Sequence, residues 1–126
     1  MPSTPSVLIC DDDANIRRLV GTILKIDGYV LSEATDAAGA LAAIEAEPPS
    51  LVILDLNFPG GGGLAVIEQV RARPELTGTR ILLVTGDTKA KEPGWGRSVG
   101  ADGHLIKPFE IAALREIVGQ LVSAAA

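Results

Sequence analysis

Four short apolar runs organise the chain, and a polar or charged residue follows each of them. The runs cover residues 7–10, 51–54, 81–84 and 104–106. Apolar runs of this length, bounded by polar residues and separated by stretches with helical spacing, predict buried strands of a parallel sheet. A less apolar stretch at 29–34 predicts one further strand.

Stretches with apolar residues three or four positions apart separate these strands and predict amphipathic helices. The first is expected over about 14–27, the second from a cap at Asp36 to Glu47, the third through Leu64, Ile67 and Val70 as far as Pro74, and the last through Ala112–Leu121. Five strands alternating with five helices predict a doubly wound α/β sandwich whose helices cover both faces of the sheet.

The segment where the fourth helix is expected, Lys89–Gly96, contains Pro93 and two glycines, which oppose helix formation. We therefore expect a fourth helix that is shortened, displaced or irregular. Trp95 in this segment is either an exposed anchor for a partner or a side chain folded over the flank of the sheet.

The composition narrows the class of protein. At 126 residues the chain suits one domain over 1–126, large enough to fold without disulfides, and the lone Cys10 is expected to be reduced and packed. A net charge of -5 argues against direct nucleic-acid binding. Neither a secretory signal nor an apolar run of membrane-spanning length is evident, so we expect a cytoplasmic protein with no membrane contact.

The polar residues that follow the strands are expected to lie together, because parallel strands end at the same edge of a sheet. They include Asp11, Asp12 and Asp55, the hydroxyl of Thr85 and the ammonium of Lys107. Clustered carboxylates need a cation, and Mg²⁺ binds one or two of them together with phosphate oxygens. The pattern predicts a magnesium and phosphoryl site, with Asp55 as the best phosphoryl acceptor.

Simpler interpretations exist for each of these residues. Asp13 is expected only to cap the first helix. Lys107 and Thr85, taken singly, would be an ordinary surface lysine and an ordinary turn residue. The adjacent pair Asp11 and Asp12 is harder to explain by capping, which needs a single carboxylate, and the combined occurrence at successive strand ends favours a functional site.

With these motifs the sequence resembles the receiver domain of two-component response regulators, from about Ser6 to Ser123. The resemblance is carried by the segments Val7–Asp13 with Ile16 and Arg17, Leu51–Gly60, Leu82–Asp87, Gly100–Gly103 and Leu105–Phe109. It implies a flavodoxin-like sheet with strand order 2-1-3-4-5.

The resemblance also implies roles for the acidic residues. Asp55 would be the phosphoacceptor, and Asp12 and Asp55 would ligate Mg²⁺ directly. Asp11 would act largely through bound water. Asn57 would supply its backbone carbonyl to the metal.

Further roles follow from the same resemblance. Thr85 and Lys107 would contact the phosphoryl group, and Pro108 would follow a cis peptide bond. Thr85 and His104 would form the switch pair, although His104 could equally be a strand histidine without a signalling role. Asn57 and Asp87 stand at positions that tune hydrolysis, and their small polar groups predict a short-lived phosphorylated state.

The loop Gly60–Gly63 departs from the Asp-Gly pair usual in that family. Four glycines increase the conformational entropy of a loop. Such a loop could settle around metal and phosphate, but a lax turn without a special role is the interpretation that we favour from sequence.

The sequence as a whole thus predicts a phosphorelay receiver. It would accept a phosphoryl group from a sensor histidine kinase or histidine phosphotransfer protein and then signal through a face formed by the fourth helix, fifth strand and fifth helix. No effector segment follows, so output is expected through a downstream protein partner, onward phosphotransfer or a domain outside this chain. The protein would be a monomer or a phosphorylation-dependent dimer.

Two rival functions stay open at this point. One is a phosphorylation-independent adaptor with the same fold. The other is a haloacid-dehalogenase-like phosphatase, because Asp11 and Asp13 match the spacing of that family's nucleophile motif, although Ala14 and Asn15 replace the Gly-Thr that usually follows.

Overall fold

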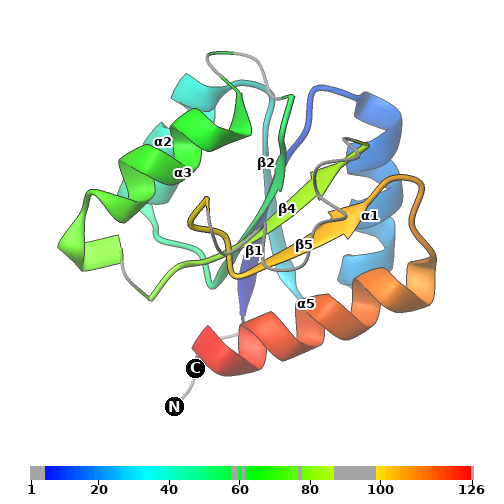
Figure 1. The fold of residues 1–126 in the computed structure, drawn as a ribbon. Coiled ribbons are helices and arrows are strands. Elements are labelled where there is room, and N and C mark those ends of the chain that lie inside the picture. The colour runs from blue at the N-terminus through cyan, green and yellow to red at the C-terminus, as the bar shows by residue number, and fades with distance from the viewer. Residues whose placement is uncertain (1–4, 58–59, 61, 77, 87–98, 126) are drawn as a thin grey trace.

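The centre of the protein is a five-stranded parallel sheet, seen in a computed structural model that describes residues 5–57, 60, 62–76, 78–86 and 99–125 (Figure 1). The strands are β1 (Ser6–Cys10), β2 (Val30–Ala34), β3 (Leu51–Asp55), β4 (Arg80–Thr85) and β5 (Gly103–Ile106). Their order is β2-β1-β3-β4-β5, and every neighbouring pair is parallel. This confirms the doubly wound order predicted from sequence.

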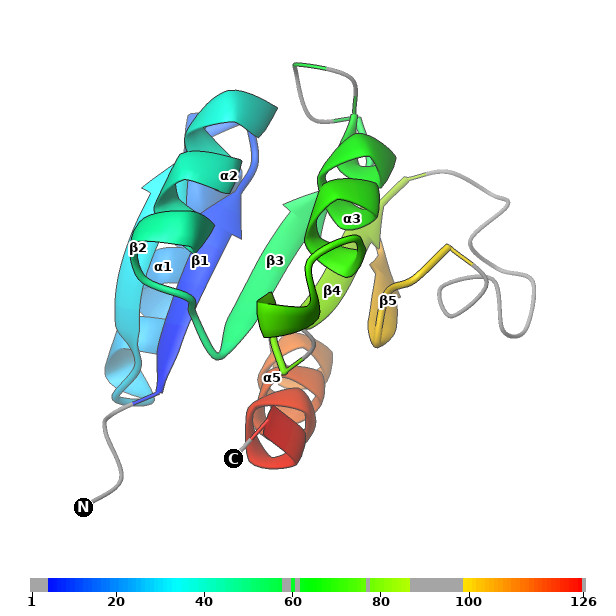
Figure 2. The same cartoon turned by 90° about the vertical axis from the view of Figure 1, so that its left-hand side faces the viewer.

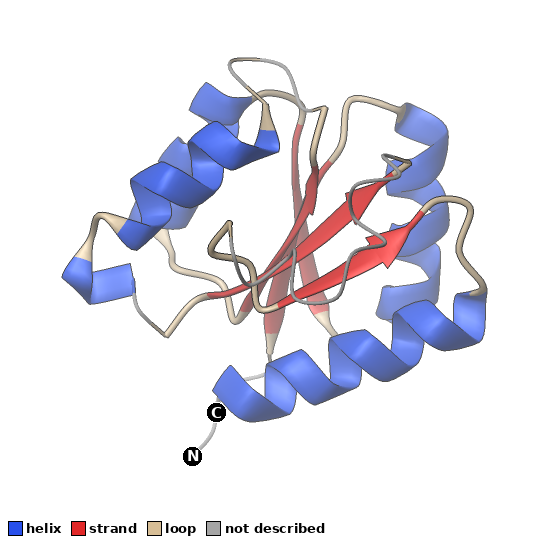
Figure 3. Cartoon of the chain, viewed as in Figure 1, coloured by secondary structure: helices blue, strands red, loops and turns tan. Residues whose placement is uncertain are grey.

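Helices cover both faces of this sheet (Figures 2 and 3). They are α1 (Ala14–Ile26), α2 (Ala37–Ala46), α3 (Gly63–Arg71) and α5 (Ile111–Ala125), with a short 3-10 helix at Pro74–Leu76. Within the described ranges, no helix has the length and apolar character needed to cross a membrane. The prediction of an irregular fourth helix, and the two alternatives for Trp95, concern residues 87–98, which lie outside the described part of the chain.

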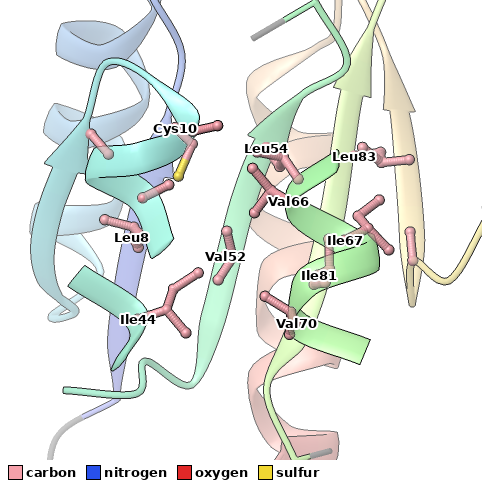
Figure 4. Close-up of a cluster of buried hydrophobic side chains, with 14 of the residues drawn as sticks. Leu8, Cys10, Ile44, Val52, Leu54, Val66, Ile67, Val70, Ile81 and Leu83 are labelled. Atoms are coloured by element: carbon pink, nitrogen blue, oxygen red, sulfur yellow. The ribbon is translucent and has the colours of Figure 1, made fainter. Parts of the chain in front are cut away.

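The core consists of two apolar layers, one on each face of the sheet. Successive strand residues point to opposite faces, so Leu8 joins the layer under α2 and α3 while Ile9 joins the layer under α1 and α5. Figure 4 shows the first layer, in which Ile44 of α2 and Val66 of α3 meet the strands. Cys10 lies in the same layer as a free, buried thiol, as its apolar surroundings in the sequence predict.

Side-chain caps and one glycine set the helix ends close to the predicted positions. The carboxylate of Asp13 accepts a hydrogen bond from the Asn15 N–H at the start of α1, which confirms its capping role. At the other end of α1, Gly28 has a φ of 92° and the Tyr29 N–H donates to the Leu24 carbonyl. Because Tyr29 completes this turn, β2 begins one residue later than the sequence predicts.

The strand register brings the ends of the central strands to one edge. Asp55, the last residue of β3, pairs with Val84, so Thr85 lies one step beyond it on β4. Asp11 and Lys107 are the residues that follow β1 and β5. The carboxyl edge of the sheet therefore holds the polar residues singled out from sequence.

Candidate functional site

Three carboxylates meet at this edge. Oxygens of Asp11, Asp12 and Asp55 all lie within 4.8 Å of one another. Asp11 and Asp55 are only 4% and 7% exposed, whereas Asp12 is open to solvent. Negative charges at this separation repel one another, and burial strengthens the repulsion, so the cluster favours a cation beside it.

Lys107 supplies one such positive charge. Its Nζ donates to Asp11 Oδ2 at 2.9 Å and lies 3.6 Å from Asp55 Oδ2. Burial alone would lower the pKa of Lys107, but the hydrogen bond from its ammonium to Asp11 and the two nearby carboxylates outweigh that effect and raise it. The ammonium stays charged and is held at the cluster, unlike that of an ordinary surface lysine.

The two oxygens of Asp55 have different surroundings. Oδ1 accepts a hydrogen bond from the Asn57 N–H at 3.1 Å, while Oδ2 faces Lys107. Burial raises the pKa of Asp55, and the charge of Asp11 adds to this, although the contacts with Asn57 and Lys107 work in the opposite direction. The structure thus fixes the orientation of Asp55, but the contacts with Asn57 and Lys107 do not fully offset the cost of burying its negative charge.

Three of the glycines after Asp55 are required by the backbone, which corrects the prediction of a lax turn, and Gly61 falls outside the described residues. Gly60 and Gly62 have φ values of 95° and 85°, in the left-handed region that favours glycine. At Gly63 a Cβ would lie 2.6 Å from the Asp55 carbonyl oxygen. The Gly63 N–H donates to the Leu56 carbonyl at 2.8 Å, which closes the loop tightly behind Asp55.

Thr85 and Lys107 are joined through the backbone. Thr85 is fully buried, and its carbonyl accepts the Lys107 N–H at 2.8 Å. The Lys107–Pro108 peptide bond is cis. His104 is partly exposed on β5, three residues before Lys107, and lies outside the carboxylate cluster, while Asp87 falls outside the described residues.

The sequence did not indicate that Arg17 contributes to the site. Arg17 donates from Nη1 to the Asp11 carbonyl at 2.7 Å, and the Asp13 N–H donates to Asp11 Oδ1 at 2.9 Å. These contacts fix the loop that presents Asp11. Arg17 lies six positions along the chain within a helix, so neither charge pattern nor periodicity could have indicated this contact.

The donor set suits a hard divalent cation. The three clustered side chains offer only carboxylate oxygens, and the exposed Asp12 leaves the cluster open to water on one side. Mg²⁺ prefers oxygen ligands and keeps several waters when it binds proteins. The residues present therefore fit Mg²⁺ beside a group that carries negatively charged oxygens.

Comparison with known sequences points in the same direction. The family model described as the response regulator receiver domain matches residues 7–119. Chemotaxis protein CheY-3 of Vibrio cholerae is 32% identical over 111 residues, which are 87% of this chain and 85% of that protein. Protein PetR of Rhodobacter capsulatus is 36% identical over 108 residues, which are 86% of this chain, but the match spans only 44% of PetR.

Solved structures resemble the whole fold. The chemotaxis response regulator CheY4 of Vibrio cholerae has a TM-score of 0.86 and 31% identity, over 94% of this chain and 99% of that one. A CheY-like response regulator receiver domain protein from Methanospirillum hungatei has a TM-score of 0.85 and 29% identity, over 98% and 97% of the two chains.

Proposed function

This chain belongs to the response regulator receiver domain family, and we propose that it takes a phosphoryl group onto Asp55 from the phosphohistidine of a sensor histidine kinase or histidine phosphotransfer protein, in a reaction that requires Mg²⁺. The observation that carries this proposal is the position of Asp55, which ends the central strand between two carboxylates and the Lys107 ammonium.

In the proposed reaction an oxygen of Asp55 attacks phosphorus. The bond between phosphorus and the donor's histidine nitrogen breaks, the imidazole keeps the electron pair, and it then takes up a proton from solvent. The Asn57 N–H holds Oδ1 of Asp55, which supports Oδ2 as the attacking atom. The Nζ of Lys107 already lies 3.6 Å from this oxygen, and its positive charge would offset the negative charge of the incoming phosphoryl group.

Mg²⁺ would be held by Asp12 and Asp55, with Asp11 acting through water and Asn57 through its carbonyl. When bound there, the ion would supply positive charge that offsets the carboxylates and the phosphoryl oxygens. Thr85 and Lys107 would contact the phosphoryl group. The geometry of the cluster supports these assignments, which are those expected from the sequence.

The phosphodonor protein must cover the rim of the acidic pocket in order to reach Asp55. A hollow of about 310 Å³ on this rim is lined by Ile16, Leu19, Lys107, Pro108 and Phe109. Leu19 is 43% exposed. We infer that an apolar side chain of the donor occupies this hollow and aligns its histidine with Asp55.

The phosphorylated state would act as a signal through Thr85 and His104. Thr85 ends β4 and His104 lies on β5, and both strands lie near α5. A downstream protein partner would bind the face expected at the fourth helix, β5 and α5, without direct contact to nucleic acid or membrane. We propose a single receiver domain over 1–126, cytoplasmic, and monomeric or dimeric according to phosphorylation.

Phosphorylation is tested with a small-molecule phosphodonor and mass spectrometry. Wild type should gain the mass of one phosphoryl group when Mg²⁺ is present and not when it is chelated, and Asp55→Asn should gain none. Asp36→Asn is the matched control. Asp36 caps α2, aspartate and asparagine are both good capping residues, and the variant should therefore be labelled like wild type. Label that persists in Asp55→Asn but disappears in Asp11→Asn would support the phosphatase rival and contradict our assignment.

Metal binding is tested separately by thermal unfolding. Mg²⁺ that binds only the folded protein should raise the melting temperature, and the rise should grow with the logarithm of the Mg²⁺ concentration relative to Kd. Asp12→Asn should lose most of this shift, and Asp13→Asn, which keeps a capping side chain, should retain it. An equal shift in both variants would mean that the ion binds elsewhere.

The adaptor rival is distinguished by amide hydrogen exchange with and without a phosphoryl mimic. A receiver that switches should change exchange on β4, β5 and α5. Change limited to the acidic pocket would favour an adaptor whose binding does not depend on phosphorylation.

A further inference from the structure

The edge of the sheet formed by β2 is available to a further strand. Among the strands that the structure describes, β2 pairs only with β1, and the Val30 N–H donates toward β1, to the Pro5 carbonyl. Backbone groups of successive strand residues point to alternate sides, so those of Leu31 and Glu33 point away from the sheet. Figure 2 shows β2 at the margin of the sheet. Such an edge can pair with an extended peptide.

A hollow of about 290 Å³ lies beside this edge, between β2 and α1. Its lining includes Arg18, Gly21 and Lys25, which share one face of the helix because they lie three and four residues apart. Gly21 keeps the hollow open. A Cβ there would lie 3.8 Å from Ile9 and 3.9 Å from Leu31, in ordinary contact, and alanine would favour the helix by about 0.5–1 kcal/mol.

The hollow is positively charged. Arg17 at its margin is engaged, with Nε 3.3 Å from Glu33 and Nη1 on the Asp11 carbonyl. Arg18 and Lys25 are exposed, and neither forms an ion pair with any residue that the structure describes. In a chain of net charge -5, two unpaired cations beside an open edge suit an acidic side chain of a partner.

The opposite face of the same edge is mainly apolar. A hollow of about 350 Å³ lies there between β2 and α2, and its lining consists of the apolar residues Val30, Leu31, Ala43, Ala46 and Pro49 and the polar residues Ser6, Ser32 and Glu47. Val30 is 56% exposed. Because side chains of a strand alternate between the faces of a sheet, a strand added to β2 would direct every second side chain into each hollow.

We propose that the β2 edge receives an extended acidic segment of a partner protein, with its acidic side chains beside Arg18 and Lys25 and its alternate apolar side chains beside α2. The open strand edge favours a polypeptide over a nucleic acid, because a peptide backbone has regularly spaced N–H and C=O groups that can pair with those of Leu31 and Glu33. The proposal does not depend on phosphorylation of Asp55, so it can fail or stand separately from the proposed function.

The probe is a labelled, capped nonapeptide in which glutamate alternates with valine, added to the full chain without phosphodonor. One control peptide has glutamine in place of glutamate, and another has the same composition with glutamates and valines grouped in pairs. The alternating peptide should bind with an affinity about tenfold above that of either control. The largest amide shifts in NMR spectra should be at Leu31 and Glu33.

Variants separate the groove from the general charge of the protein. Arg18→Gln should weaken binding of the alternating peptide about twofold to fivefold, the range for one exposed ion pair. Arg73→Gln removes the same charge from an exposed pair with Glu45 and should leave binding unchanged. Gly21→Leu should abolish binding by filling the hollow, and Gly21→Ala, which adds one methyl group, should weaken it less.

Several outcomes would overturn the proposal. They are the absence of binding, equal binding of the three peptides, equal effects of Arg18→Gln and Arg73→Gln, and shifts confined to other elements. Self-association through β2 would identify a second copy as the occupant, and tighter binding of single-stranded DNA would identify a nucleic acid. If Gly21→Leu does not fold, the comparison of Arg18→Gln with Arg73→Gln decides whether the peptide binds in this hollow.

Discussion

At the scale of single residues, Asp55 is a buried carboxylate whose environment disfavours its own negative charge. Burial raises its pKa, and neither the Asn57 N–H nor Lys107 offsets that rise. A carboxylate held in this way is costly to the folded state. It is also well placed to gain from an added cation.

Asp55→Asn should therefore stabilise the metal-free protein at neutral pH. A raised pKa in the folded state means that the protonated form of Asp55 is favoured by folding, and this contribution is lost as pH rises through the folded pKa. The variant avoids that loss, so we expect its free energy of unfolding to exceed that of wild type at pH 7.

The difference should shrink as pH falls through the raised folded pKa of Asp55 towards 3.8, the ordinary pKa of an aspartate, and should be absent below that pH. Urea unfolding with chelator present, across the pH range, measures it. Asp36→Asn serves as the control and should follow wild type throughout. A variant less stable than wild type at neutral pH would show that the Lys107 contact outweighs burial.

At the scale of elements, the junction between β3 and α3 sets the position of Asp55. Gly63 begins α3 directly behind the Asp55 carbonyl, and its N–H closes the loop onto Leu56. The absence of a Cβ is what allows the helix to start so close to the strand. This contact explains why the chain needs glycine at this position, although the loop looks permissive in sequence.

Gly63→Ala should destabilise the fold by about 1–3 kcal/mol, because its Cβ would overlap backbone atoms of Asp55 and Leu56 that cannot move independently. Gly119→Ala in α5 is the matched control. A Cβ at Gly119 has no heavy atom within 4 Å, so alanine should stabilise the helix by about 0.5–1 kcal/mol. Thermal and urea unfolding give both values, and a neutral Gly63→Ala would refute the steric argument.

At the scale of the molecule, Asp102 links three elements at the end of the sheet opposite the acidic pocket. Its carboxylate accepts from Arg71 Nη2 at 2.7 Å, from the Ile81 N–H at 2.8 Å and from Arg80 Nη1 at 3.3 Å. Arg71 also donates to the carbonyls of Gly100 and Thr79. This network connects α3 to β4 and to the chain that enters β5.

Asp102→Ala should lower the free energy of unfolding by about 2 kcal/mol, since it removes the acceptor that the Ile81 N–H, Arg71 and Arg80 share. Asp102→Asn keeps one acceptor oxygen and should cost less. Glu45→Ala removes an exposed pair with Arg73 and should cost about 0.5 kcal/mol or less. Equal losses for Asp102→Ala and Glu45→Ala would show that the network adds nothing beyond a surface pair.

The sequence alone determined the sheet, its order and the membership of the acidic pocket. Buried parallel strands must be apolar on both faces, and their polar ends must meet at one edge, so periodicity located Asp11, Asp55, Thr85 and Lys107 without any distance. Family resemblance supplied the strand order and the cis bond before Pro108. The strands and the polar residues at their ends follow from local patterns, which a linear sequence records directly.

Only the tertiary structure decided contacts between residues that no periodicity relates. Several contacts arise only when separate elements pack together. They are the ion pair of Asp102 with Arg71, the hydrogen bond from Arg17 to the Asp11 carbonyl, the close approach at Gly63 and the hollows on either side of β2. Their energies depend on distances of a few ångströms between distant parts of the chain. A one-dimensional pattern specifies which elements form, but it carries no information on how closely they approach.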